Sequence, residues 1–286
     1  ESGVHVVVAT PGKLKSFINN KYMDCDSIKY LILDEADRML DIGFYDDIIS
    51  IIETLPKKRQ TLLFSATMPD KIIKLSKKIL ENPVEIKIAV SKPNEKILQI
   101  AYLSYDEQKV ELLTRLLKDK PKYNSIIIFS STKKNVTRIV AALRREGMAA
   151  EAISSNLEQK DRESMLTDFK ARKVRILVAT DVISRGIDIK DISLVINYDV
   201  PRDAEDYVHR IGRTARAEAS GVAITLINPD DMYYFSGIEK LIGREIMKLE
   251  VPEDLGESPV WEPGRRKNYG RPSKKGGRGS YKKKKR

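Results

Sequence analysis

Short runs of β-branched and aliphatic residues alternate along this chain with longer segments whose apolar residues recur three and four positions apart. The first pattern predicts strands and the second predicts amphipathic helices. Strands are expected at residues 4–9, 30–33, 61–64, 84–88, 125–129, 149–153, 175–179, 194–198 and 222–227, and helices at 108–118, 134–146 and 159–170. Because strands that alternate with helices form βαβ units, the sequence predicts an α/β fold with mainly parallel sheets.

Two changes in composition divide the chain into domains. Residues 89–96, which include Pro93 and Asn94, interrupt the pattern and predict a linker between a first domain at 1–88 and a second at 97–251. From residue 252 onward Pro, Gly and Glu become frequent, and the last part of the chain is rich in Gly, Lys and Arg. Because this composition cannot bury a core, residues 252–286 are expected to form a disordered basic tail.

The tail accounts for the charge of the whole chain. The 286 residues carry 52 Lys and Arg against 41 Asp and Glu, a formal net charge of +11. Residues 264–286 contain no acidic residue, and without them the chain is nearly neutral. Such a tail predicts binding to the phosphates of a nucleic acid. The alternative is a disordered end that only keeps the chain in solution.

Composition also excludes several classes of protein. The single cysteine, Cys25, excludes a disulfide framework and a multi-cysteine metal site. No apolar run approaches the ~18 residues that a membrane-spanning helix needs, and no signal peptide is recognisable. We therefore expect a cytoplasmic chain with no membrane partner.

Small and polar residues directly follow five of the predicted strands. These clusters are Thr10-Pro11-Gly12, Asp34-Glu35-Ala36-Asp37, Ser65-Ala66-Thr67, Ser130-Ser131-Thr132 and Thr180-Asp181. In open parallel sheets, ligands bind beyond the carboxyl ends of the strands. The sequence therefore predicts a site in a cleft between two sheets.

The acidic cluster after the second predicted strand is typical of a nucleotide hydrolase. Asp34 would hold Mg²⁺ through water, and Glu35 would orient or deprotonate the attacking water. The alternative is an acidic turn that caps a helix. If the strands before the two clusters are neighbours, the hydroxyls of Ser65 and Thr67 would hydrogen-bond Asp37. The alternative for these two residues is helix capping.

Three arginines, Arg210, Arg213 and Arg216, recur at every third residue. On a helix they would share one face, and together with the acidic cluster they would act as arginine fingers that stabilise charge on a transferring phosphoryl group. By themselves they would be solvated surface charges. In an earlier segment, Gly186 would let a phosphate approach the backbone and Asp188 would accept from a ribose hydroxyl. The alternative for that segment is an ordinary loop.

In this order and spacing, the motifs resemble those of the DEAD-box ATP-dependent RNA helicases over about residues 3–228. The linker and the basic tail are most similar to the bacterial RhlE-like branch of that family. The resemblance implies two RecA-like domains that use ATP and Mg²⁺ and bind RNA, single-stranded or in short duplexes, without sequence preference. It also implies unwinding of those duplexes or remodelling of ribonucleoprotein complexes.

The resemblance further implies roles for the residues that match the family's motifs. Asp34, Glu35, Arg213 and Arg216 would act in catalysis and, with Gly186 and Asp188, would bind ATP, with Asp34 on the metal. Coupling between ATP and RNA would involve Asp37, Ser65, Thr67 and His209. RNA contacts or domain closure would involve Thr10, Pro11, Gly12, Lys13, Ser130, Gln159, Arg162, Thr180, Arg185 and Gly186.

One motif of that family is absent from these 286 residues. No G-x-x-x-x-G-K-[ST] phosphate-binding loop occurs, and the first residue is Glu1 rather than Met. We therefore expect an incomplete first domain, in a helicase fragment that does not hydrolyse ATP by itself. The alternative is a non-enzymatic RNA-binding or annealing module made of the second domain and the tail.

Overall fold

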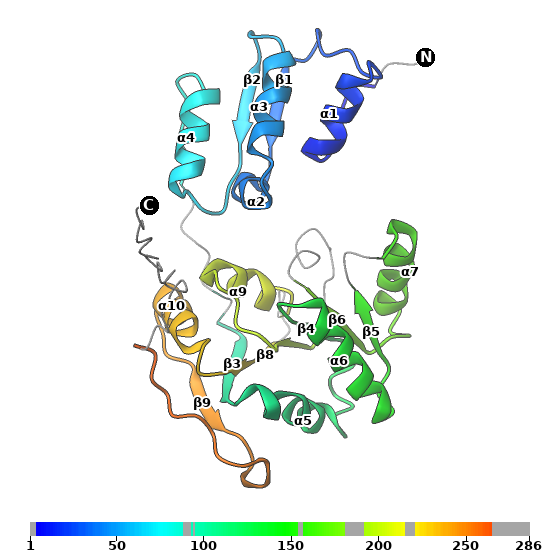
Figure 1. The fold of residues 1–286 in the computed structure, drawn as a ribbon, viewed down its shortest axis with the longest axis vertical. Coiled ribbons are helices and arrows are strands. Elements are labelled where there is room, and N and C mark those ends of the chain that lie inside the picture. Colours follow the sequence, from blue (N-terminus) through cyan, green and yellow to red (C-terminus); the bar gives the residue numbers. More distant parts are fainter. Residues whose placement is uncertain are drawn as a thin grey trace, which may run out of the picture. The chain divides into compact units, whose positions relative to one another are not determined.

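In a computed structural model the chain folds into two compact units, Glu1–Val90 and Ser91–Arg286 (Figure 1). The structure describes residues 4–87, 93, 95–153, 157–180, 192–214 and 221–264. The boundary between the units falls inside the stretch at 89–96 that the sequence predicts as a linker.

Among its described residues, the first unit contains the parallel strands β1 (Tyr30–Leu33) and β2 (Gln60–Leu63). Their residues pair in register from Tyr30↔Gln60 to Leu33↔Leu63. Both strands lie within one residue of the positions that the sequence predicts. Around them lie α1 (Pro11–Asn19), α2 (Ala36–Ile42), α3 (Tyr45–Thr54) and α4 (Asp70–Ile79).

The core of the first unit is a small apolar cluster between the strands and α2, α3 and α4. On α4, Ile72, Leu75 and Ile79 are spaced by three and four residues and are buried, whereas the lysines of the helix are exposed. This spacing places the three apolar residues on one face of the helix. They pack in the same cluster as Leu33 of β1 and Leu40 of α2. The predicted strand β1 is therefore packed against helices through its buried residue Leu33.

Two strands predicted for the first unit do not form. Residues 4–9 and 84–87 have no strand structure, and residue 88 lies outside the described residues. Val6 and Val8 are 77% and 93% exposed, and Val84 and Ile86 are 88% and 81% exposed. The expectation was wrong because a β-branched run becomes a strand only when a neighbour pairs its backbone and a core covers its side chains. The described part of the unit supplies neither.

The second unit is organised by a parallel sheet in the order β5-β6-β4-β7-β8-β3-β9. Its strands are β3 (Ile97–Leu103), β4 (Ile126–Phe129), β5 (Ala150–Ile153), β6 (Ile176–Ala179), β7 (Leu194–Asn197), β8 (Gly221–Ile227) and β9 (Met247–Glu250). Strands β4 to β8 overlap the predicted ones. The sequence pattern does not predict β3, whose apolar run Gln99 interrupts, or β9, which is short and half charged.

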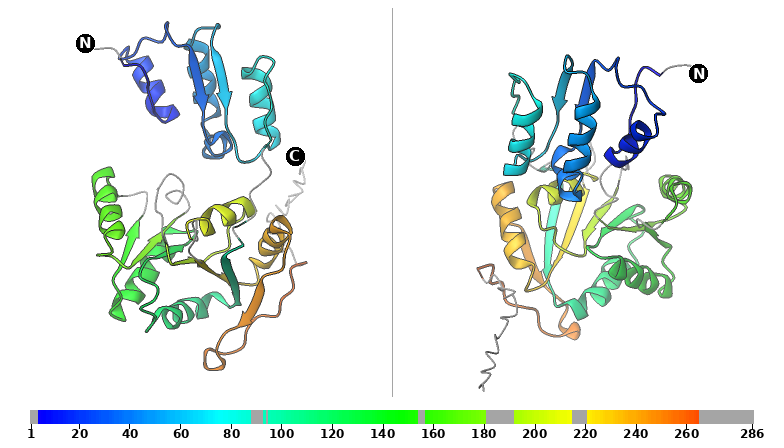
Figure 2. Two further views of the ribbon diagram at one scale, coloured as in Figure 1. Left: turned by 180° about the vertical axis from the view of Figure 1, so that it is seen from behind. Right: turned by 45° about the horizontal axis from the view of Figure 1, so that its top comes forward.

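Helices cover both faces of this sheet (Figure 2). The helices α5 (Asp106–Leu117) and α6 (Lys133–Arg145) pack on one face, and α7 (Gln159–Lys170), α9 (Ala204–Ile211) and α10 (Met232–Ile242) pack on the other. Strands β4, β6 and β7 are buried along their whole length, as expected for a parallel sheet that is shielded on both faces. The α/β prediction is confirmed, and α5, α6 and α7 lie within two residues of the predicted helices.

The chain after β9 packs on the second unit up to residue 264, so the prediction of a disordered tail from residue 252 was wrong for this stretch. A 3₁₀ helix forms at Glu253–Leu255, and Nε2 of Gln108 donates to the carbonyl oxygen of Leu255 at 2.8 Å. Trp261 packs edge-on against Phe235 with ring centroids 6.1 Å apart. A few anchoring contacts order a segment whose Pro and Gly content is typical of a loop. Residues 265–286 lie outside the described residues.

Candidate functional site

Two acidic side chains are exposed at the carboxyl end of β1. Asp34 and Glu35 form the turn between β1 and α2, where Oδ1 of Asp34 accepts from the backbone N–H of Glu35 at 2.9 Å. Glu35 has a left-handed backbone with a φ of 48°, which costs a non-glycine residue about 1–3 kcal/mol. The Glu35 side chain makes no capping hydrogen bond to α2. The helix-cap alternative therefore does not account for this turn, which presents two carboxylates to solvent.

A buried carboxylate, Asp37, ties this turn to the end of β2. Its Oδ2 accepts from the backbone N–H and from the hydroxyl of Thr67, at 2.9 Å each. The Ser65 hydroxyl accepts from the backbone N–H of Asp37 at 3.2 Å and donates to the carbonyl oxygen of Thr67 at 2.7 Å. The predicted contact with the Asp37 carboxylate is thus confirmed for Thr67, whereas Ser65 contacts the backbone. Neither hydroxyl caps α4, which begins after Pro69.

The cluster at residues 10–13 forms the start of α1 instead of following a strand. Thr10 precedes the helix in an extended conformation and Pro11 occupies its first turn, where the missing N–H of proline costs nothing. Thr10, Gly12 and Lys13 are exposed. A helix start with exposed N–H groups and a nearby ammonium favours a phosphate as ligand. These residues therefore suit the predicted contact with an RNA backbone.

In the second unit, the turn after β4 has one buried and two exposed members. Ser130 is 0% exposed, and its hydroxyl donates to Oδ2 of Asp199 at 2.7 Å. The backbone N–H of Ser131 donates to the same oxygen at 2.6 Å. Thr132 caps α6 by accepting from the backbone N–H of Asn135 at 3.1 Å. The buried Ser130 hydroxyl is directed toward Asp199, and the expected role of this residue in RNA contact or domain closure stays a prediction. Ser131 and Thr132 are the exposed members.

Arg210 and Arg213 do not share a helix face, which corrects the prediction from their spacing for these two residues. Arg210 lies on α9, is 2% exposed, and donates from Nη1 to Oδ1 of Asn197 and to the carbonyl oxygen of Asp199, at 3.0 Å each. The helix ends at Ile211, and Arg213 follows in a turn, half-buried. Arg210 is therefore a core residue and not a solvated charge. Arg216 lies outside the described residues.

The other predicted residues of the second unit are spread over three elements. Thr180 is 7% exposed and directly follows β6. Gln159 begins α7, Arg162 is half-buried one turn later, and His209 is exposed on α9. Arg185, Gly186 and Asp188 lie outside the described residues. The cleft between two sheets stays a prediction.

The exposed carboxylates of Asp34 and Glu35 are compatible with Mg²⁺ binding. Among the described residues, no group of three or more His, Cys, Asp or Glu side chains could enclose a metal. Mg²⁺ is commonly held by one or two carboxylates together with waters and substrate phosphates. Asp34 and Glu35 are compatible with that mode and not with an all-protein metal cage.

No helix in the described part of the chain is long and apolar enough to cross a membrane.

Two family profiles match the chain, one in each unit. The profile of the DEAD/DEAH box helicases matches residues 1–75, and that of the helicase conserved C-terminal domain matches residues 108–218. The first match includes the Asp34 turn and Thr67, and the second includes the turn at Ser130 and the arginines. The chain belongs to the DEAD-box helicase family.

Relatives with curated names support this family and show how much of it the chain represents. The ATP-dependent RNA helicase CshA of Listeria monocytogenes is 41% identical over 248 residues, which are 86% of this chain and 48% of that protein. The DEAD-box ATP-dependent RNA helicase CshA of Streptococcus pneumoniae is 43% identical over 259 residues, 90% of this chain and 49% of that protein. The chain thus spans about half the length of the curated relatives that it matches.

Solved DEAD-box structures share the fold. S. cerevisiae Dbp5 bound to RNA and ADP BeF3 has a TM-score of 0.75 and 33% identity, and the match covers 84% of this chain and 64% of that one. A DEAD box protein from Methanococcus jannaschii has a TM-score of 0.51 and 41% identity over 84% of this chain and 65% of that one. These likenesses confirm the α/β fold with parallel sheets, which the chain shares with solved DEAD-box proteins.

Reasoning from the sequence missed the buried polar residues of this chain. Lys109 is 0% exposed, and Arg210 and Asn197 hydrogen-bond each other in the core. One signal for Lys109 was available, because it precedes Leu112 and Leu113 by three and four positions and so stands on the apolar stripe of α5. No comparable signal marks Arg210 or Asn197, whose burial depends on contacts between distant segments.

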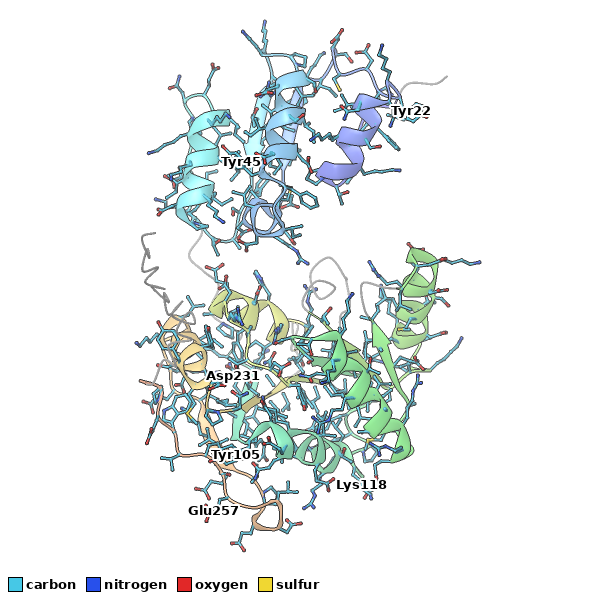
Figure 3. All side chains as sticks on the ribbon, viewed as in Figure 1. Tyr22, Tyr45, Tyr105, Lys118, Asp231 and Glu257 are labelled. Atoms are coloured by element: carbon cyan, nitrogen blue, oxygen red, sulfur yellow. The ribbon has the colours of Figure 1, made fainter. Side chains whose placement is uncertain are left out.

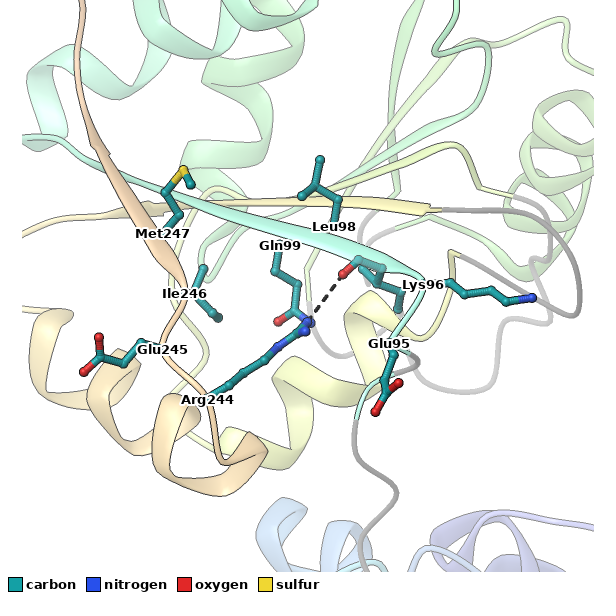
Figure 4. Close-up of a pocket in the computed structure, with 9 residues that line it drawn as sticks. Glu95, Lys96, Leu98, Gln99, Arg244, Glu245, Ile246 and Met247 are labelled. Atoms are coloured by element: carbon teal, nitrogen blue, oxygen red, sulfur yellow. Dashed lines mark hydrogen bonds between the residues drawn. The ribbon is translucent and has the colours of Figure 1, made fainter.

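A cavity of about 330 Å³ lies at the beginnings of β3 and β9 (Figure 4). Residues 95–99 and 244–247 line it, and Nη2 of Arg244 donates to the carbonyl oxygen of Ile97 at 3.4 Å. None of the predicted site residues is among its lining residues. The cavity is at the amino ends of the strands, whereas ligands of open parallel sheets bind beyond the carboxyl ends. The cavity is therefore not where an open parallel sheet is expected to bind its ligand.

Proposed function

We propose that this chain acts in ATP-dependent remodelling or unwinding of RNA. The observation that carries the proposal is the Asp34–Glu35 turn, whose exposed carboxylates stand beside a buried Asp37 that Thr67 holds in place. A protein that only bound RNA would not need acidic groups at the carboxyl edge of a sheet, where ligands of open parallel sheets bind. The matched relatives are named ATP-dependent RNA helicases, and the Dbp5 structure contains RNA and ADP BeF3.

In this proposal the first unit supplies the hydrolytic groups. Asp34 would hold Mg²⁺ through water, and Glu35 would orient the attacking water or take its proton. When bound, Mg²⁺ would neutralise charge on the phosphates of ATP. Asp37 and Thr67 would keep the turn in place as ligands bind.

The second unit would supply charge stabilisation and RNA contacts. Arg213 and Arg216 are proposed to stabilise the transferring phosphoryl group, and Gly186 and Asp188 to contact the nucleotide. RNA is proposed to contact the exposed residues at the start of α1 and those at the starts of α6 and α7, with the backbone as the main target because phosphate contacts need no particular base. His209 and Ser65 are proposed to couple the two ligands.

The finer assignment to the RhlE-like branch stays a prediction that rests on the linker and the tail. The relatives reported above are CshA proteins. The basic residues of the tail support RNA binding in either branch, because counterion release from phosphates is independent of sequence.

The test measures RNA-stimulated ATP hydrolysis. The 286-residue chain alone is expected to show none, since it contains no phosphate-binding loop. A chimera is made in which the part of Listeria CshA that comes before its matched region is joined to residue 1 of this chain. This chimera is expected to hydrolyse ATP. In the chimera, Glu35→Gln should lower turnover by about 10²-fold or more, the range typical of general-base loss. Glu53→Gln, the same change at an exposed position of α3, serves as the matched control.

Turnover by the Glu35→Gln chimera at the control's rate would contradict the proposed role of Glu35. The alternative function, an RNA-binding or annealing module, is favoured by the lack of a phosphate-binding loop in these residues. Annealing of complementary RNA strands without ATP, together with a chimera that shows no RNA-stimulated turnover, would support that alternative.

A further inference from the structure

A fully buried ammonium group lies beneath the carboxyl edge of the second sheet. Lys109 on α5 is 0% exposed, and its Nζ lies 3.2 Å from Oδ1 of Asp106, 3.8 Å from Oδ1 of Asp199 and 3.7 Å from Oδ2 of Asp231. The ring of Tyr198 covers it, with its centroid 5.5 Å from Nζ. An ammonium is stable in such a place only when carboxylates compensate its charge. Lys109 is thus the centre of a buried ionic cluster.

Of the three carboxylates, Asp199 contacts the turn after β4. Its Oδ1 faces Lys109, while its Oδ2 accepts from the Ser130 hydroxyl at 2.7 Å and from the Ser131 backbone N–H at 2.6 Å. Both are short hydrogen bonds to an ionised acceptor, which are stronger than bonds between neutral groups. The two oxygens of Asp199 thus join the buried ammonium of Lys109 to the turn after β4.

The Asp106 carboxylate contacts a different segment, the loop after β8. Oδ1 of Asp106 accepts from Nδ2 of Asn228 at 2.9 Å, and the backbone N–H of Asp231 donates to Oδ1 of Asn228 at 2.8 Å. Asp231 follows β8 and is marked in Figure 3. Asp106 and Asp199 therefore share Lys109 as a partner but hold different loops, which makes them a matched pair for an experiment.

The turn that Asp199 holds is the exposed entrance to α6. Ser131 and Thr132 are exposed, Thr132 caps the helix, and the next two residues are lysines. The start of this 13-residue helix combines backbone N–H groups, a hydroxyl and ammonium groups, a set of donors that suits phosphate oxygens. The two hydrogen bonds to Asp199 hold the turn from which α6 begins.

We propose that Lys109 and Asp199 are positioning residues that hold the Ser131–Thr132 turn in the geometry that binds an RNA phosphate. The inference rests on the proposed function, since it assigns this turn to RNA. Neither residue touches RNA in this arrangement: Lys109 is fully buried, and the Asp199 side chain is 15% exposed.

The experiment compares Asp199→Ala with Asp106→Ala in the full chain. Each change removes one carboxylate from Lys109, but only the first releases the turn. Hydrogen exchange of the Ser131 amide is the direct readout, because that N–H donates to Asp199. Loss of a hydrogen bond to a charged acceptor should lower Ser131 protection about tenfold or more in Asp199→Ala. Asp106→Ala should stay within about twofold of the unmodified chain.

RNA affinity is the second readout. Binding of a labelled single-stranded 12-mer is measured at 200 mM salt, where phosphate contacts of the basic tail are weakened. The dissociation constant should rise about fivefold to tenfold in Asp199→Ala and in Lys109→Met. The double variant Lys109→Met/Asp199→Ala should bind RNA no more weakly than Lys109→Met alone, because the effects of coupled residues on binding are not additive. If Asp199→Ala impairs folding, Asp199→Asn, which keeps one acceptor oxygen, replaces it.

Unchanged Ser131 exchange in Asp199→Ala, or equal changes in Asp199→Ala and Asp106→Ala, would overturn the positioning role. Altered Ser131 exchange with unaltered RNA affinity would overturn it as well. If the unmodified chain does not bind RNA at all, the proposed function fails. Ser131 exchange then still shows whether Lys109 and Asp199 hold the turn.

Discussion

Thr67 donates twice to one carboxylate oxygen of Asp37, from its backbone N–H and from its hydroxyl, at 2.9 Å each. The two residues are thirty positions apart in the sequence, and they stand just beyond the ends of the paired strands β2 and β1. Their contact fixes the turn that presents Asp34 and Glu35 relative to the neighbouring strand. The stability of this turn can therefore be tested at Thr67.

Thr67→Val is expected to destabilise the first unit. The change removes the hydroxyl donor and keeps the side-chain shape, and a hydrogen bond to a charged group contributes about 1.5–3 kcal/mol. The free energy of opening, measured by hydrogen exchange of amides in β1 and β2, should fall by about that amount. Thr67→Ser keeps the hydroxyl and should cost less than about 1 kcal/mol. Equal exchange in Thr67→Val and the unmodified chain would contradict the role of this hydrogen bond.

Asp231 should make the stability of the second unit depend on pH. Burial raises its pKa to about 6, nearby Asp199 and Asp106 also raise it, and Lys109 opposes them. A carboxyl whose pKa is higher in the folded than in the unfolded state contributes stability below its unfolded pKa, and this stability is lost as the pH rises through 6. Asp231→Asn should therefore stabilise the unit at pH 8 and change little near pH 4.

The size of that gain follows from the pKa. The pKa of Asp231 lies about two units above its ordinary value of 3.8, and one unit corresponds to about 1.36 kcal/mol. The gain at pH 8 should therefore be on the order of 3 kcal/mol, measured by denaturant unfolding at both pH values. Asp230→Asn, at the exposed neighbouring position, removes the same charge and should show no such gain. An equal gain in the free energy of unfolding at pH 4 and pH 8 would show that titration of Asp231 does not cause it.

Alanine should have opposite effects at two glycines of the second unit. At Gly212, after α9, a Cβ would lie 3.0 Å from the carbonyl oxygen of Val208, so Gly212→Ala should destabilise by about 1–3 kcal/mol. At Gly237, inside α10, a Cβ would meet no atom within 4 Å, so Gly237→Ala should stabilise by about 0.5–1 kcal/mol. Thermal unfolding measures both. A loss of stability in both variants, or in neither, would be inconsistent with these environments.

Deletion of residues 265–286 should weaken the salt dependence of RNA binding. Log affinity for a single strand falls with log salt at a slope of about −0.7 for each phosphate neutralised, and the deleted residues are rich in Lys and Arg. The slope should become flatter by the same amount for RNAs of different sequence. A chain with these Lys and Arg changed to Gln keeps the length of the tail and should match the deletion. A slope that does not change would show that the tail takes no part.

Local patterns predicted the elements and contacts that depend on neighbours in the sequence. The apolar runs that form β4, β6 and β7 are unbroken because both faces of their sheet are covered. The contact between Thr67 and Asp37 was also predictable, because each follows one of two parallel strands and such strands end at the same edge of a sheet. The exposed turn at Asp34 and Glu35 follows from the same reasoning.

The sequence by itself determined the α/β class, the order of most elements and the family, because periodicity and motif spacing are properties of short segments. Only the tertiary structure decided that residues 4–9 and 84–87 stay unpaired, that Arg210 enters the core and that Lys109 lies among three carboxylates. Asp231 lies 122 positions from Lys109 along the chain, and Asn197 and Arg210 come from different elements. A charged residue is buried or exposed according to partners that folding brings to it, and no local pattern specifies them.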